Sequence, residues 1–160
     1  MTIKIGDKLP EAKFMTSTKD GPKPTNTQEI FGGKKIALFA VPGAFTPTCS
    51  ARHLPSYVEK AEELKAKGVD AIACTSVNDV FVMGSWAKDQ GIKDEITMLA
   101  DGNASFAKAI GLDFDGAAFG MGTRSQRYGM VVDDCVVTHL FVEQGGEYKV
   151  SSAEYMLENM

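Results

Sequence analysis

Hydrophobic positions along the first half of the chain alternate between strand-like runs and helical spacing. Residues 34–41 (KKIALFAV) and 69–77 (VDAIACTSV) are nearly continuous apolar runs of strand length, which predicts two buried strands. Between them, apolar residues recur at helical spacing from 50 to 68, with Glu and Lys on the remaining positions. We therefore expect a strand, helix, strand unit with parallel strands and a right-handed crossover.

The next segments continue the same alternation. Asn78 or Asp79 is placed to cap a helix that ends at Gly91. A short apolar strand follows at 96–100, and a short helix is predicted at 104–112. A third strand therefore follows a second helix, as in a sheet with helices packed against it.

The last part of the chain is richer in β-formers. Residues 114–126 contain several glycines and no hydrophobic period, so we predict a loop there. Residues 127–143 hold two β-rich runs around Asp133 and Asp134, which indicates an antiparallel hairpin. A serine ahead of Glu154 predicts a C-terminal helix. This order of elements predicts an α/β fold with a central mixed β-sheet flanked by helices.

Composition and charge restrict the function classes. The 160 residues, of which 44% are hydrophobic and 24% charged, fit one domain spanning residues 1–160. The net charge of -4, with lysines scattered along the chain, argues against a nucleic-acid partner, because phosphate binding needs clustered positive charge. The longest apolar runs are too short to cross a bilayer, so no membrane partner is expected.

Cysteine usage points to a reducing compartment. The three cysteines, at positions 49, 74 and 135, are odd in number and widely spaced, unlike those of a disulfide-stapled secreted protein. The N-terminus lacks a basic stretch followed by an apolar run, and we expect a cytoplasmic protein. There is no CxxC pair, so the sequence contains neither a zinc-ribbon nor a dithiol motif.

Cys49 is the strongest candidate for chemistry. The strand at 34–41 leads through the turn PGAFTPT into a helix that is expected to begin at or just after Cys49. Helix N-termini lower thiol pKa values, because free N–H groups and the helix dipole favour the thiolate. Pro42 and Pro47 stiffen the turn, and the hydroxyl of Thr46 can hydrogen-bond near the sulfur. A buried structural cysteine in a rigid turn fits the same local pattern, so both readings stay open on this basis alone.

A resemblance to a known family favours the reactive cysteine. Pro42, Thr46 and Cys49 form the pattern P-x-x-x-T-x-x-C, which resembles the active-site signature of the peroxiredoxins, thiol peroxidases on a thioredoxin-like fold. The chain is similar to the type II, or peroxiredoxin 5, subfamily in particular. The similar segments are PGAFTPTCSxxHLP at 42–55, SVNDxFVMxxW at 76–86, RSQRYGMVV at 124–132 and VSSAExML at 150–157.

The resemblance implies roles for individual residues. Cys49 would be the peroxidatic cysteine, with Thr46 and Pro42 as its direct partners. Arg127 would activate both thiolate and peroxide, and it is preferred over the nearby Arg124 because it directly precedes an aromatic residue at the start of a strand. The expected substrates are hydrogen peroxide and small organic hydroperoxides. Cys49 would become a sulfenic acid, and no metal or organic cofactor is expected.

The resemblance leaves the regenerating thiol open. Some relatives resolve the sulfenic acid with a C-terminal cysteine, where this chain has Ser151. Cys74 is a possible resolving residue, although a cysteine in a buried strand is more often structural. Cys135 matches no family position. We therefore expect an external thiol, glutathione or glutaredoxin, as the reductant. Many bacterial relatives are fused to a glutaredoxin domain, which is not present in this sequence up to Met160, and thioredoxin is therefore the alternative.

Other features admit two readings each. His53 follows Cys49 at helical spacing, but His139 is remote, so His53 is expected at a pocket edge or dimer contact rather than in a metal site. Four residues could form an apolar wall for alkyl peroxides or be ordinary core, namely Phe45, Trp86, Phe119 and Met121.

The resemblance implies a homodimer. The alternative function is a redox sensor or holdase that passes the oxidation of Cys49 to a partner protein.

Overall fold

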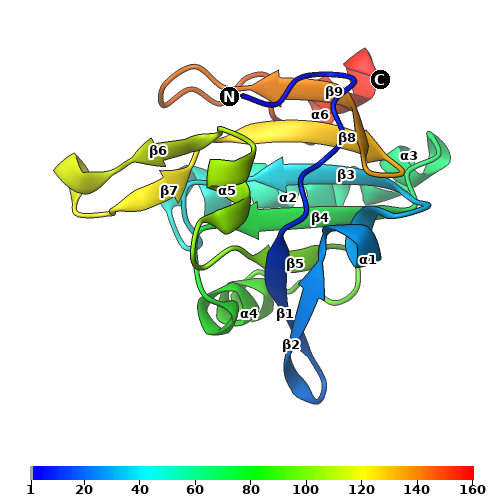
Figure 1. Cartoon of the computed structure of the whole chain (residues 1–160). Coiled ribbons are helices and arrows are strands. Elements are labelled where there is room, and N and C mark those ends of the chain that lie inside the picture. The colour runs from blue at the N-terminus through cyan, green and yellow to red at the C-terminus, as the bar shows by residue number, and fades with distance from the viewer. Residues whose placement is uncertain (1) are drawn as a thin grey trace.

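The computed structural model describes residues 2–160 and places seven strands in one mixed sheet. Across the sheet the order is β2-β1-β5-β4-β3-β8-β9 (Figure 1). The bounds are β1 Lys13–Thr18, β2 Gly21–Asn26, β3 Lys35–Ala40, β4 Ala71–Ser76, β5 Thr97–Ala100, β8 Tyr128–Asp133 and β9 Val136–Val142. The α/β fold with a central mixed sheet, predicted from the order of elements, is confirmed.

The middle of the sheet is a parallel core of three strands. β3 pairs with β4, and β4 with β5, both in parallel register, as expected for strands joined by crossover helices. Both faces of β3 are covered, which explains its unbroken apolar run. Ala37 and Phe39 are buried on one face, and Ile36 and Leu38 on the other. The carboxyl end of β3 is thereby fixed from both sides, and the turn toward Cys49 starts there.

Helices cover both faces of the sheet. One face carries α2 (Leu54–Glu59), α3 (Ala61–Ala66), α4 (Val80–Asp89) and α6 (Ala153–Asn159). The other carries α1 (Thr27–Phe31) and α5 (Ser105–Ala109), which lie in front of the sheet in Figure 1. Two apolar clusters result, one on each side of the sheet, and Cys49 belongs to the cluster under α2.

The helix after β3 differs from the predicted single helix over 50–68. Helical backbone begins at Pro47, passes through a π-helical turn at Cys49–His53 and continues as α2. Proline suits the first helical position because its missing N–H would have no partner there. The helix breaks at Lys60 before α3, and Gly68, with φ of +96°, closes it as expected. Cys49 therefore lies within the first helical turn rather than at its very start.

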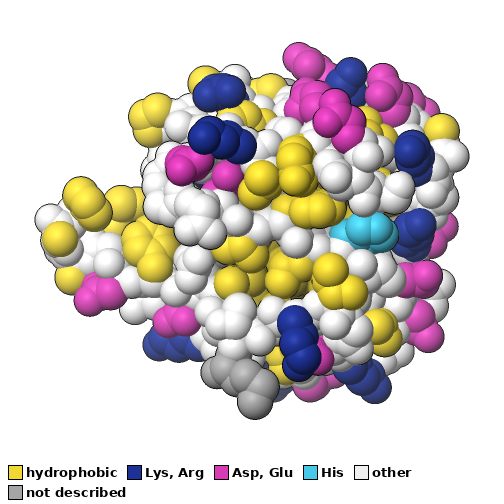
Figure 2. Space-filling model, turned by 90° about the horizontal axis from the view of Figure 1, so that it is seen from above, with side chains coloured by type: hydrophobic (Ala, Val, Ile, Leu, Met, Phe, Trp, Pro, Cys, Tyr) yellow, Lys and Arg dark blue, Asp and Glu magenta, His cyan; other side chains and the backbone are white. Residues whose placement is uncertain are grey.

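The segment predicted as a loop, residues 114–126, is an ordered arm. β6 (Asp113–Asp115) and β7 (Thr123–Ser125) pair in antiparallel register around a 3₁₀ turn at Ala117–Phe119. The arm projects from the body on the left of Figures 1 and 2, and Figure 2 shows hydrophobic side chains on it. The loop prediction was wrong because strands of three residues are too short to show a period.

Two hairpins complete the sheet. β1 and β2 form an N-terminal hairpin that the sequence pattern did not reveal. β2, which contains Pro22 and Pro24, occupies the outer edge of the sheet, the position at which a strand tolerates proline. The predicted β8-β9 hairpin is confirmed, with Asp134 (φ +46°) and Cys135 (φ +69°) in the turn. Among residues 2–160, no helix is long and apolar enough to cross a membrane.

Candidate active site

Cys49 is a buried thiol in the first turn of the helix that begins at Pro47. The first N–H groups of a helix have no intrahelical partner, and they give this turn a positive potential. Two side chains are hydrogen-bonded to its sulfur. The hydroxyl of Thr46 lies 2.8 Å from Cys49 Sγ, and Nη2 of Arg127 lies 3.1 Å from it. The structure thus places two donors from separate parts of the chain on the sulfur.

Thr46 has two competing acceptors for one proton. Its Oγ1 lies 2.8 Å from Cys49 Sγ and 2.7 Å from the carbonyl oxygen of Gly43. A hydroxyl donates once and accepts up to twice. When Cys49 is a thiolate, Thr46 donates to the sulfur. When Cys49 is a thiol, its S–H can donate to Oγ1 while Thr46 donates to Gly43. The same residue therefore matches both protonation states of the cysteine.

Arg127 lies immediately before β8 and shares its guanidinium between two side chains. Nη2 reaches Cys49, and Nη1 lies 2.9 Å from Nδ1 of His53. Arg124, the alternative from the sequence, points elsewhere: its Nε donates to the carbonyl of Met121 at 2.9 Å and its Nη1 to that of Val77 at 3.4 Å. Of the two arginines, Arg127 contacts the sulfur, and Arg124 ties the arm to the chain before α4.

The turn that carries Pro42 and Thr46 is held by a hydrogen bond to Asn78, which lies just after β4. The Oδ1 atom of Asn78 accepts from the N–H of Ala44 at 2.9 Å. The next residue, Phe45, has φ of +67°, a left-handed conformation that is unusual for an aromatic residue. The sequence offered Asn78 or Asp79 as the cap of α4, and the cap is Asp79, which accepts from the N–H of Val82. Asn78 instead holds the active-site turn.

A cavity of about 520 Å³ opens beside Arg127. It is lined by Pro42, Phe114, Phe119, Met121, Gln126, Arg127, Glu143, Gly145 and Gly146. Phe119 and Met121 therefore contribute the apolar wall that the sequence suggested. Trp86 does not: it is fully buried in the core, where its indole nitrogen donates to Ser50 Oγ at 2.9 Å. Phe45 is 51% exposed and is not among the lining residues.

The sequence placed His53 at a pocket edge or a dimer contact, but its side chain is fully buried within the chain. Its Nε2 lies 2.9 Å from the carbonyl oxygen of Ser151, and its Nδ1 faces Arg127. Burial and, secondarily, the positive charge of Arg127 lower the pKa of His53 to about 3. The imidazole is therefore neutral at physiological pH. The family signature around Cys49 includes this histidine, but spacing alone could not show which side chain it contacts.

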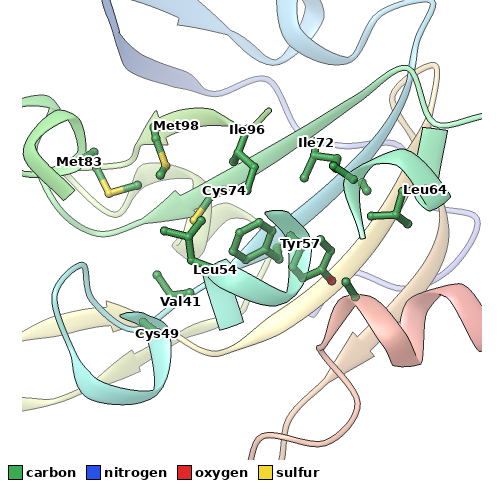
Figure 3. Packing of buried hydrophobic residues seen from close by; sticks show 14 of the residues in the cluster. Val41, Cys49, Leu54, Tyr57, Leu64, Ile72, Cys74, Met83, Ile96 and Met98 are labelled. Carbon is green, nitrogen blue, oxygen red and sulfur yellow. The ribbon is translucent and has the colours of Figure 1, made fainter. Parts of the chain in front are cut away.

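The other two cysteines lie apart from the donors around Cys49. Cys74 is fully buried on β4, in the same apolar cluster as Cys49 and Leu54 (Figure 3). Burial, with a smaller contribution from the charge of Cys49, raises the pKa of the Cys74 thiol well above its usual value. Cys135 is buried in the β8-β9 turn, and burial raises the pKa of its thiol too. Within residues 2–160 the three cysteines form no disulfide.

Metal-ligating side chains do not gather at this site. Over the described residues 2–160, there is no group of three or more His, Cys, Asp or Glu side chains that could hold a metal ion. The chemistry that the site itself offers is that of one sulfur, one hydroxyl and one guanidinium next to an apolar cavity.

Comparisons with known proteins show which proteins this chain is similar to. The Redoxin family model matches residues 4–157. Peroxiredoxin-2E, chloroplastic, from Arabidopsis thaliana is 48% identical over 98% of this chain and 69% of its own length. Peroxiredoxin-2B from the same plant is 44% identical over 98% of this chain and 97% of its own. The crystal structure of reduced Prx3 in complex with H₂O₂ from Vibrio vulnificus superposes with a TM-score of 0.95 at 54% identity, covering 99% of each chain.

Proposed function

Because this chain belongs to the Redoxin family and, within it, to the type II peroxiredoxins, we propose that Cys49 is the residue at which it reduces peroxides. The protein is a thiol-dependent peroxidase with a thioredoxin-like fold. Its substrates are peroxides, and its electrons come from a thiol. The observation that supports Cys49 is the pair of donors on its sulfur, Thr46 at 2.8 Å and Arg127 at 3.1 Å.

The reaction at Cys49 is a displacement on the peroxide O–O bond. The thiolate sulfur attacks one oxygen, an S–O bond forms, and the O–O bond breaks, so that sulfur is oxidised and the peroxide is reduced. The departing oxygen leaves as hydroxide or alkoxide and takes up a proton to become water or an alcohol. Negative charge therefore grows on that oxygen in the transition state. Arg127, Thr46 and the N–H of Cys49 are fixed donors that can stabilise this charge without reorganising.

Pro42 and the neighbouring cavity bear on the choice of peroxide. Pro42 lies in the wall of the cavity beside Arg127, and its ring offers no N–H to compete for the peroxide oxygens. Phe114, Phe119 and Met121 contribute apolar surface to the same cavity. A cavity with one cationic and several apolar residues suits hydrogen peroxide and small alkyl hydroperoxides, because the alkyl group can pack against the aromatic side.

The sulfenic acid on Cys49 is regenerated by an external thiol in this proposal. A thiol attacks the oxidised sulfur, water leaves, and a second thiol releases the mixed disulfide. Glutathione with glutaredoxin is the proposed donor, and thioredoxin is the alternative. Full burial and a raised pKa make Cys74 a poor nucleophile, which argues for a structural role rather than a resolving one.

Two further properties complete the proposal. We place the protein in the cytoplasm, a reducing compartment, because its three cysteines are unpaired over residues 2–160. We also propose that it is a homodimer. The support for the dimer is a group of exposed aromatic side chains, Phe45, Phe81 and Phe119, which are 51, 70 and 79% exposed.

The function is tested by peroxide consumption under turnover. Wild type, Cys49→Ser and Cys74→Ser are each supplied with hydrogen peroxide, once with glutathione and glutaredoxin and once with the thioredoxin system. We expect Cys49→Ser to be inactive with both donors and Cys74→Ser to cycle at close to the wild-type rate with glutaredoxin. Activity that survives in Cys49→Ser would overturn the assignment of the peroxidatic residue.

The same assay separates the peroxidase from the alternative redox sensor or holdase. A sensor is oxidised once per peroxide and then waits for a particular partner, whereas an enzyme consumes many equivalents with excess thiol. A single-turnover reaction that persists with both donor systems would favour the sensor. If Cys74→Ser reacts once and then stops while wild type continues, Cys74 is the resolving cysteine.

A further inference from the structure

A continuous line of hydrogen bonds runs from the C-terminal part of the chain to the Cys49 sulfur. The carbonyl of Ser151 contacts His53 Nε2 at 2.9 Å, His53 Nδ1 contacts Arg127 Nη1 at 2.9 Å, and Arg127 Nη2 contacts Cys49 Sγ at 3.1 Å. Each contact has ordinary hydrogen-bond length. His53 thus stands between a backbone carbonyl and the guanidinium that contacts the sulfur.

The two partners of His53 require one particular form of the ring. A carbonyl oxygen can only accept, so Nε2 must carry a proton to bond with Ser151. A guanidinium can only donate, so Nδ1 must present a lone pair to Arg127. Both conditions are met by the neutral Nε2–H tautomer and by no other protonation state. The carbonyl of Ser151 therefore selects the tautomer that Arg127 needs.

The surroundings of His53 keep that form stable. The ring is packed against Phe39 at 4.9 Å, Tyr57 at 5.7 Å and Tyr148 at 5.2 Å between ring centroids. The charged and titratable groups that face it are Arg127, Tyr57 and Tyr148. A nearby cation and a buried apolar environment both disfavour the imidazolium, so the acceptor at Nδ1 persists across the physiological pH range.

The Ser151 carbonyl is itself held in place. Oε2 of the buried Glu143 accepts from the N–H of Ser151 at 2.8 Å, from its hydroxyl at 2.6 Å, and from the N–H of Lys149 at 2.8 Å. Tyr57 donates its hydroxyl to the same carbonyl at 2.8 Å. The Ser151 carbonyl is therefore fixed in direction, and because His53 Nε2 donates to it, the imidazole ring has little freedom to rotate.

We propose that His53 is a positioning residue for peroxide reduction: its Nδ1 lone pair orients the Arg127 guanidinium toward the Cys49 sulfur. This inference rests on the proposed function of Cys49 and assigns a new role within the same site. An arginine has several rotatable bonds, so a second acceptor at His53 Nδ1 restricts the directions that its guanidinium can take. Without that acceptor, Arg127 donates to the sulfur for a smaller fraction of the time.

Two substitutions of His53 by amide residues provide the test, because each keeps a polar atom near the position of one of the two ring nitrogens. In His53→Asn the side-chain oxygen can take the place of Nδ1 and accept from Arg127. In His53→Gln the amide nitrogen can take the place of Nε2 and donate to Ser151, but the acceptor for Arg127 is lost. The measurement is the second-order rate constant for oxidation of the reduced protein by hydrogen peroxide. Stopped-flow fluorescence of the single tryptophan, Trp86, reports it, because Trp86 contacts Ser50 next to Cys49.

We expect His53→Asn to stay within about threefold of wild type and His53→Gln to lose about ten- to one-hundred-fold, the range for one hydrogen bond to a charged group. In an Arg127→Gln background, the two His53 variants should differ by less than about twofold, because the residue through which His53 acts is gone. A merely structural role would instead lower both rate constants in parallel with thermal stability, in either background, and would overturn the proposal.

A second measurement needs no variant to fold. The ¹⁵N resonances of His53 in the wild-type protein should show a protonated Nε2 and an unprotonated Nδ1 from about pH 5 to 8, a range that includes the ordinary histidine pKa. A protonated Nδ1 at neutral pH would overturn the inference. Failure of the proposed function looks different, since wild type itself would then show no oxidation at Cys49 by mass spectrometry.

Discussion

The hydroxyl of Thr46 and the guanidinium of Arg127 converge on the Cys49 sulfur from separate parts of the chain. Fixed donors of this kind contribute mainly in the transition state, where charge has moved onto the peroxide oxygens. We expect Arg127→Gln to lower the second-order rate constant with hydrogen peroxide by about 10² to 10³. Thr46→Val should lower it by about tenfold or more, because a neutral donor contributes less. Stopped-flow oxidation of the reduced protein measures both.

Two neighbouring residues serve as matched controls for these variants. Thr48 precedes Cys49 directly and makes no side-chain cap hydrogen bond in the described structure, so Thr48→Val should oxidise at close to the wild-type rate. Arg124 contacts the carbonyls of Met121 and Val77 rather than the sulfur, so Arg124→Gln should lose much less than Arg127→Gln. The reverse ranking of the two arginine variants would assign the activating role to Arg124.

His53 also makes stability depend on pH. Its pKa in the folded protein is about 3, against about 6.5 for an unperturbed histidine. Between these values the unfolded chain binds a proton that the folded chain does not, so the free energy of unfolding falls as the pH falls. From pH 7 to pH 5 we expect His53 to account for a loss of roughly 2 kcal/mol. Urea unfolding of wild type and His53→Asn at both pH values measures it, and an equal loss in the two proteins would contradict the assignment.

Single residues show which parts of the site are readable from sequence. Cys49, Thr46 and Arg127 belong to a spaced signature, and the structure brings their polar atoms together at hydrogen-bond distance. The partners of His53 were not readable, because Ser151 contributes a backbone carbonyl, which no side-chain pattern reveals. The sequence offered Asn78 or Asp79 as the cap of α4, and the structure shows Asp79; the contact of Asn78 with the Cys49 turn was not predicted.

Among the structural elements, the start of α4 and the Cys49 turn depend on each other through Asn78. The Asn78 Oδ1 atom accepts from the Ala44 N–H and from the hydroxyl of Ser76. Asn78→Ala leaves the Ala44 N–H without its acceptor, and we expect a loss of about 1–3 kcal/mol in stability. We also expect a fall of at least about fivefold in the peroxide rate constant, because the turn carrying Thr46 is no longer held. Urea unfolding and stopped-flow oxidation measure the two effects.

Two variants make this result specific. Asn78→Asp keeps an acceptor at the same place and should retain most of the rate. Asp79→Ala removes the cap of α4 and should cost about 1 kcal/mol, but with little effect on the rate constant. If Asp79→Ala slows oxidation as much as Asn78→Ala does, the loss comes from general destabilisation of α4 rather than from the turn.

The elements differ in how far the sequence predicts them. β3 and β4 are buried on both faces, and such strands appear as continuous apolar runs that are easily recognised. The arm of β6 and β7 consists of two three-residue strands, each too short for any period to emerge. The break between α2 and α3 and the π-helical turn leave the apolar spacing almost unchanged, so a single helix was the natural prediction.

Over the whole molecule, three exposed phenylalanines lie on segments that follow β3 or β4 or are tied to them. Phe45 lies in the Cys49 turn, which Asn78 ties to the start of α4, and Phe81 lies in the first turn of α4. Phe119 lies on the arm, which Arg124 ties to Val77 in the same region. Exposed aromatic residues on segments beside an active site are typical of an interface between proteins. The proposed homodimer therefore has its contact at this aromatic group.

The dimer is tested by placing a charge in this aromatic group. We expect wild type to sediment as a species of twice 17.2 kDa. Phe81→Glu should raise the dissociation constant by about one-hundred-fold or more, because it removes an apolar contact and buries a carboxylate without a partner. Ile5→Glu is the matched control: Ile5 is 61% exposed but lies in the N-terminal segment, outside the aromatic group, so that variant should remain dimeric. Sedimentation velocity over a concentration series measures all three proteins. A monomeric wild type, or dissociation by Ile5→Glu but not by Phe81→Glu, would contradict an interface at the aromatic group.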